Sequence, residues 1–183
     1  MNDEKMDAFW SSIGFMLSGI YRDKKAYEGY KKNGEILEYS SLEEMEIVAI
    51  LEEIGYSLET AGTYLYKSLI ISVLNYLKGN AVRLEVLDEE ELQRQLNEPY
   101  SQLYFDIARN ELDLGVKTFH ESIANASLKV LENNTDRELV GKIFTGKFDP
   151  KMYGINALMI AKYYANLRGF IKSEQNLRRT KNS

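Results

Sequence analysis

The stretch LETAGTYLYKSLIISVLNYLK, residues 58–78, carries the apolar pattern that decides the fold class. Leu65, Leu69 and Val73 recur every four residues, which places them on one face of an α-helix. Gly79 follows directly, and glycine suits the left-handed backbone position just past a helix end. We therefore expect this segment to form the core helix of the protein.

The same helical periodicity extends through most of the remaining chain, and only two prolines interrupt it. Ser41, Asp88 and Thr135 are each followed three residues later by glutamate, a pattern that predicts a capped helix start. The helix that begins at Ser41 is expected to end at Ile54, before a glycine. Pro150 suits the first position of the last helix. These patterns predict an all-α fold.

The amino-terminal segment has an apolar helical face of its own, formed by Phe9, Ile13, Met16 and Ile20. It predicts a helix over residues 1–23 that is buried on the body of the protein or across a homodimer interface. Residues 27–39 contain Asn33-Gly34, a pair typical of tight turns, so this segment is either a small hairpin or an irregular linker. Residues 82–87 alternate weakly in polarity and are a candidate short strand.

Composition and charge limit the classes of function. The chain has no cysteine and one histidine, which excludes disulfides, a thiolate nucleophile and a multi-histidine metal centre. Phosphate-binding glycine loops and the common hydrolase motifs are absent, so we expect no enzymatic activity, no catalytic residue, no metal and no cofactor. The first 20 residues match neither a signal peptide nor a membrane span, which favours a cytoplasmic protein without membrane contact. A net charge of -5 confines any nucleic-acid binding to a local patch.

Two helical patterns lie on either side of a short connection in the second half of the chain. The first pattern consists of Leu103, Tyr104, Ile107 and Ala108, and the second of Phe119, Ile123, Ala126 and Val130. The connection, Leu112 to Gly115, contains glycine. Two helices joined in this way predict a helix-turn-helix motif.

Several local motifs resemble the carboxy-terminal DNA-binding domain of the stage-zero sporulation response regulator family, over residues 42–167. Glu53-Ile54-Gly55, Gly62, Tyr64-Leu65-Tyr66-Lys67 and Ile70 are similar to that family's segment joining its first two helices. Tyr104 to Arg109 looks like the first helix of its helix-turn-helix, and residues 118–131 fall where its recognition helix would lie. The resemblance implies a bacterial transcription regulator that binds double-stranded DNA.

The sequence departs from that family in three respects. Residues 1–40 stand in place of the receiver domain, so control by phosphorylation is not implied. Residues 80–98 look like an insertion before the helix-turn-helix. The family's recognition helix carries several arginines, whereas Glu121 and Ala124 occupy the positions where basic residues would be expected.

The candidate nucleic-acid-binding residues are Lys117, Thr118, His120, Glu121 and Asn125. Asparagine can pair bidentately with adenine, and lysine can bind guanine or phosphate. His120 is either a contact residue on the exposed face or a solvated helix residue. The function predicted first is DNA-binding regulation of transcription. The alternative is a protein-interaction module, in which the same helical scaffold has lost DNA binding and binds a macromolecular partner or itself.

These expectations divide the chain into three parts. Residues 1–40 form an amino-terminal helix with a linker or hairpin, and residues 41–171 form the helical domain that contains the helix-turn-helix. Residues 172–183 are a flexible tail with several basic side chains.

Overall fold

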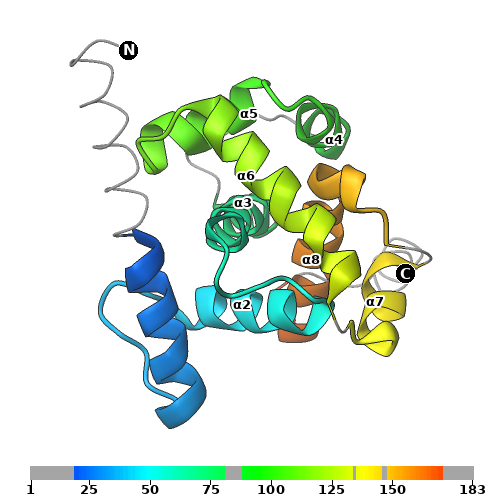
Figure 1. Cartoon of the computed structure of the whole chain (residues 1–183). Helices are drawn as coiled ribbons and strands as arrows, with labels where there is room; N and C mark the ends of the chain where they lie inside the picture. The colour runs from blue at the N-terminus through cyan, green and yellow to red at the C-terminus, as the bar shows by residue number, and fades with distance from the viewer. Residues whose placement is uncertain (1–18, 81–87, 134, 146–147, 171–183) are drawn as a thin grey trace.

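The computed structural model describes residues 19–80, 88–133, 135–145 and 148–170, and all regular secondary structure within these ranges is helical (Figure 1). Residues 19–33 are helical, and the elements that follow are α2 (Leu42–Ile54), α3 (Ala61–Leu77), α4 (Glu89–Asn97), α5 (Gln102–Phe105), α6 (Val116–Leu128), α7 (Arg137–Phe144) and α8 (Tyr153–Arg168). The all-α expectation is confirmed. The candidate strand at 82–87, the helix expected before residue 19 and the basic tail lie outside the described residues.

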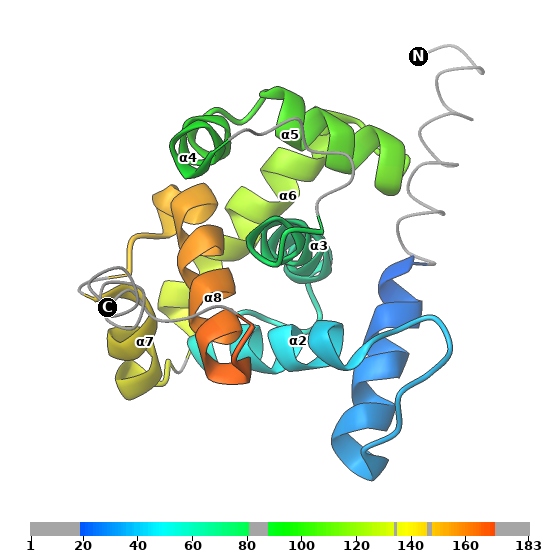
Figure 2. The same ribbon diagram turned by 180° about the vertical axis from the view of Figure 1, so that it is seen from behind.

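Helix α3 lies at the centre of the molecule, and α2, α6 and α8 pack around it (Figures 1 and 2). Its side chains Tyr66, Leu69, Ile70, Val73 and Leu74 are fully buried. The predicted core helix is thus confirmed, with α6 and α8 covering much of its surface. None of the helices in the described part of the chain has the length and apolar character that crossing a membrane requires.

The helix boundaries follow the predicted caps at three places. The Ser41 hydroxyl accepts a hydrogen bond from the backbone N–H of Glu44 at 3.2 Å, and α2 ends at Ile54. Asp88 accepts from the N–H of Glu91 at 2.8 Å and starts α4. Pro150 begins a 3₁₀ turn, Pro150–Met152, that leads directly into α8.

The end predicted for the first helix, at Asp23, is wrong, because the helix continues to Asn33. Ala26 and Tyr27 are buried beside residues of α2 and α3, so packing favours further helical turns. The Asn33-Gly34 pair ends this helix instead of turning a hairpin. Gly34 has a φ of 67°, and its N–H donates to the carbonyl of Tyr30 at 2.8 Å.

The predicted cap of α7 is also wrong by one residue. Asp136, not Thr135, accepts from the backbone N–H of Leu139, at 3.1 Å. Aspartate and threonine are both good caps, so sequence preference alone does not separate them. The N–H of Asp136 donates to the carbonyl of Glu53 at 3.1 Å, and this contact with α2 fixes where α7 begins.

Helices α3 and α6 cross with their backbones in contact at Gly62. A Cβ atom built on Gly62 would lie 2.0 Å from the carbonyl oxygen of Ser122 and 2.7 Å from the Cβ of Ala126. Real Cβ atoms do not approach other atoms so closely. Only glycine therefore permits this crossing, which sets the position of α6 on the core.

We predict that Gly62→Ala destabilises the protein by roughly 3 kcal/mol, because the added methyl group must push the two helix backbones apart. Gly141→Ala is the matched control. Gly141 is exposed within α7, and a Cβ there has nothing within 4 Å, so alanine should stabilise the fold by about 0.5–1 kcal/mol. Urea unfolding followed by circular dichroism measures both changes. Equal effects of the two substitutions would contradict a backbone contact at Gly62.

Candidate nucleic-acid interface

The five candidate residues all lie on α6, and four of them, Lys117, Thr118, Glu121 and Asn125, are exposed. Lys117, Glu121 and Asn125 are spaced four residues apart, so they form one stripe along the helix. The opposite side of α6 buries Phe119, Ile123 and Ala126 in the core. The structure thus brings these four candidates together on one exposed surface of α6.

Sequence reasoning missed a further residue of this stripe. Lys129 directly follows α6, is exposed, and continues the four-residue spacing from Asn125. Because α6 runs into a 3₁₀ turn, Lys129–Glu132, the helical register carries on to this position. Extending the same spacing by one step would have identified it.

The charges on and around α6 are only weakly neutralised by protein groups. Lys117 Nζ lies 4.0 Å from a carboxylate oxygen of Glu121, and both side chains are exposed, so solvent screens the attraction. Arg109 and Lys151 are exposed on segments that pack against α6. Within the described ranges, neither these two residues nor Lys129 takes part in an ion pair. Four cationic side chains thus remain available to an anionic ligand.

His120 is neither fully solvated nor part of the exposed stripe. Its side chain is partly buried, and its Nδ1 atom is hydrogen-bonded to the hydroxyl group of Tyr153 at the start of α8. The imidazole ring also lies against Tyr100, with ring centres 5.6 Å apart. The structure therefore places His120 at the border between the exposed and buried faces of α6, where it is partly buried. Position 120 lies at the edge of the buried face, where the Tyr153 ring reaches it.

The protonation state of this pair follows from burial. Burial raises the pKa of Tyr153 to about 12, so its hydroxyl keeps its proton at neutral pH and is able to donate to His120. Burial also lowers the pKa of His120, while the carboxylate of Glu121 acts in the opposite direction. At neutral pH the imidazole is therefore uncharged.

A fully buried hydrogen bond holds the other end of α6. The Tyr56 hydroxyl lies 2.8 Å from Oγ of Ser127, and both side chains are buried. The Tyr66 hydroxyl donates from the core to the carbonyl of Tyr153 at 2.6 Å. Sequence analysis missed these positioning residues because their partners lie far away in the chain. Together they fix α6 against α3 and α8.

The described residues contain no group of three or more acidic or histidine side chains arranged to hold a metal ion. Comparison of the chain with protein-family models, with curated proteins and with solved structures found no match.

The single histidine allows a direct test of the electrostatics beside the stripe. In an NMR titration, the pKa of His120 should lie below its ordinary value of about 6.5. Glu121→Gln should lower this pKa further, because it removes the carboxylate that favours the imidazolium form. Glu138→Gln, on α7, is the control and should leave the pKa unchanged.

The same shift sets the sign of a pH effect on stability. The fold favours neutral His120, so its contribution is complete above pH 6.5 and is lost as the pH falls below that value. His120→Asn should remove this part of the pH dependence of the unfolding free energy. A wild-type pKa at or above 6.5 would contradict the described burial.

Proposed function

We propose that the protein is a DNA-binding regulator of transcription that reads duplex DNA with the exposed face of α6. The observation that carries this proposal is the chemistry of the stripe: from 117 to 125, every exposed residue of α6 is polar or charged. A polar helix face suits the major groove, which admits an α-helix and presents hydrogen-bonding groups. The resemblance to the effector domain of the stage-zero sporulation regulators supports the same role, in the cytoplasm of a bacterium.

Each residue of the stripe has a distinct part in this proposal. Asn125 can pair bidentately with adenine, and Thr118 can donate to or accept from a base edge or a phosphate. Lys117 and Lys129, at either end of the stripe, suit phosphates or guanine. Glu121 can accept a hydrogen bond from the amino group of cytosine, although its charge repels the phosphates nearby.

The partly buried pair at His120 contributes indirectly. Because Tyr153 orients the imidazole away from the exposed stripe, His120 acts as a positioning residue that holds α6 in register with α8. The exposed surface of α6 and its neighbouring segments carries few basic side chains, so it can contact few phosphates. The salt dependence of DNA binding should therefore be shallow.

We predict distinct effects for three substitutions in a titration against duplex DNA at low salt. Lys117→Glu should weaken binding to every duplex and reduce the salt slope by about 1, because a phosphate contact is lost. Asn125→Ala should cost about 1–3 kcal/mol on the preferred site only, since it removes base recognition. Glu121→Arg should raise affinity for all duplexes, because a repulsive charge becomes attractive.

The matched controls are Lys142→Glu and Glu138→Arg. These two residues form another exposed ion pair spaced by four residues, on α7, with Nζ and the carboxylate oxygen 3.5 Å apart. They reproduce the same charge changes away from the stripe and should leave binding nearly unchanged. If selection from random duplexes recovers no preferred sequence, or if stripe and control variants behave alike, α6 is not a DNA reader.

One observation favours protein binding as the second candidate function. Leu128 and Leu131, at the carboxyl end of α6 and just beyond it, are 48% and 66% exposed. Exposed apolar side chains of this size suit a macromolecular partner better than a phosphate backbone. In that case Leu131→Lys should abolish partner binding or self-association, while the three stripe substitutions should have no effect.

A further inference from the structure

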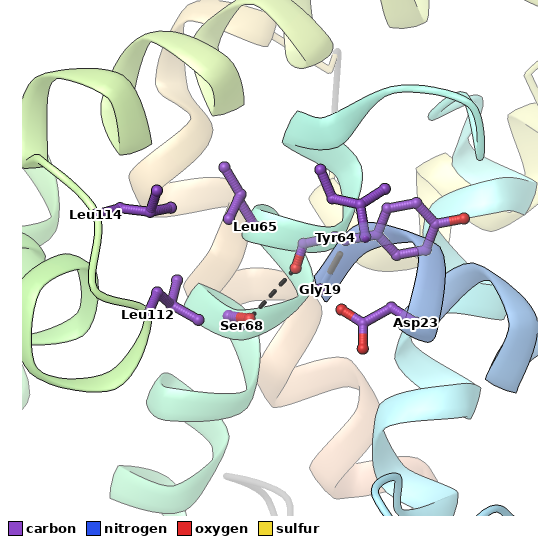
Figure 3. Close-up of a pocket in the computed structure, with 8 residues that line it drawn as sticks. Gly19, Asp23, Tyr64, Leu65, Ser68, Leu112 and Leu114 are labelled. Atoms are coloured by element: carbon purple, nitrogen blue, oxygen red, sulfur yellow. Dashed lines mark hydrogen bonds between the residues drawn. The ribbon is translucent and has the colours of Figure 1, made fainter. Parts of the chain in front are cut away.

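A pocket lies between the helix at residues 19–33, α3 and the connection that leads into α6 (Figure 3). The pocket is open to solvent, and its volume together with the space at its mouth is about 350 Å³. Leu112 and Leu114 approach from the connection, Leu65 comes from α3, and Gly19 and Ile20 come from the amino-terminal helix. Most of the exposed lining is therefore apolar.

The polar groups at the edge of this pocket already have partners. Asp23 lies 3.1 Å from the buried Nζ of Lys67, and the Ser68 hydroxyl donates to the carbonyl of Tyr64 at 3.3 Å. The Tyr64 hydroxyl donates to the carbonyl of Leu58 at 2.7 Å. With no unpaired polar group to satisfy, the pocket suits an apolar side chain better than a polar ligand.

The chain itself supplies an apolar segment at the mouth of the pocket. Residues 1–18 precede Gly19, which lines the pocket, so they are covalently tethered beside it. Met16 stands four residues before Ile20, and Ile13 and Phe9 continue the same helical register. A short tether gives such a segment a high effective concentration at the site, which a separate partner would have to exceed.

We propose that this pocket is the docking site for the apolar face of residues 9–17 of the same chain, with Met16 inserted between Leu65 and Leu114. The sequence left burial on the body and burial across a homodimer as alternatives, and the pocket favours the first. The inference goes beyond DNA binding and does not depend on it. Leu112 and Leu114 immediately precede α6, so docking also links the amino-terminal segment to the start of that helix.

Because the chain contains no cysteine, paired cysteine substitutions give a clean test. Met16→Cys combined with Leu114→Cys should form an intramolecular disulfide under mild oxidation, because docking holds the two positions on neighbouring segments, where small backbone movements bring the cysteines into disulfide geometry. Met16→Cys combined with Leu112→Cys tests whether Met16 also lies close to Leu112, the other leucine that lines this side of the pocket. The control pair is Met16→Cys with Leu128→Cys, whose second site is exposed at the far end of α6. Non-reducing electrophoresis and peptide mass spectrometry measure the yield.

We expect a yield at least tenfold higher for the pocket pairs than for the control, at a rate independent of protein concentration. A disulfide-linked dimer whose yield rises with concentration would overturn the proposal in favour of a second copy. Equal yields in all three pairs would overturn it by showing no preferred docking.

A second measurement leaves the pocket wall intact, in case the cysteine variants fold poorly. A photoreactive phenylalanine analogue at position 16 of the otherwise natural chain should crosslink to peptides containing residues 64–68 or 112–114. Crosslinks to other regions alone would also overturn the proposal. DNA titration of the same protein is a separate readout, so failure of docking and failure of DNA binding can be told apart.

Discussion

The contact between α3 and α6 at Gly62 is the constraint on which the rest of the structure depends. The missing side chain lets the two backbones touch at Ser122, so that Phe119 and Ile123 reach the core around α3. When one side of a helix is held this closely against the core, the residues on its opposite side must face solvent. The exposure of Lys117 and its neighbours therefore follows from a close packing contact on the far face of the helix.

Two hydrogen bonds, one partly buried and one buried, then hold α6 against rotation or sliding on that contact. The bond of His120 with Tyr153 ties its first half to α8, and the bond of Tyr56 with Ser127 ties its second half to the segment between α2 and α3. A buried hydroxyl without a partner is costly, so each bond penalises any other register of the helix. A rigidly held helix can present its exposed side chains to a ligand with little loss of conformational entropy.

The buried lysine of α3 attaches the amino-terminal helix to the same core. Lys67 Nζ lies 3.1 Å from Asp23 and 3.2 Å from Glu44, so one ammonium group connects the helix at residues 19–33 with α2 and α3. Separation of these elements would leave a buried charge unpaired, which is strongly unfavourable. Ala26 and Tyr27 add apolar burial on the same side. The position of this helix in turn forms one wall of the apolar pocket.

The sequence by itself determined the all-α class, the core helix, and the ends of α2 at Ser41 and Gly55. These features depend on periodicity and capping, which act over a few residues. The same periodicity placed Lys117 and Asn125 on one helix. Only tertiary structure decided that the first helix continues past Asp23 and that His120 turns toward Tyr153. Burial against segments distant in the chain outweighs local preference at these places, and no short-range pattern encodes which distant group will arrive.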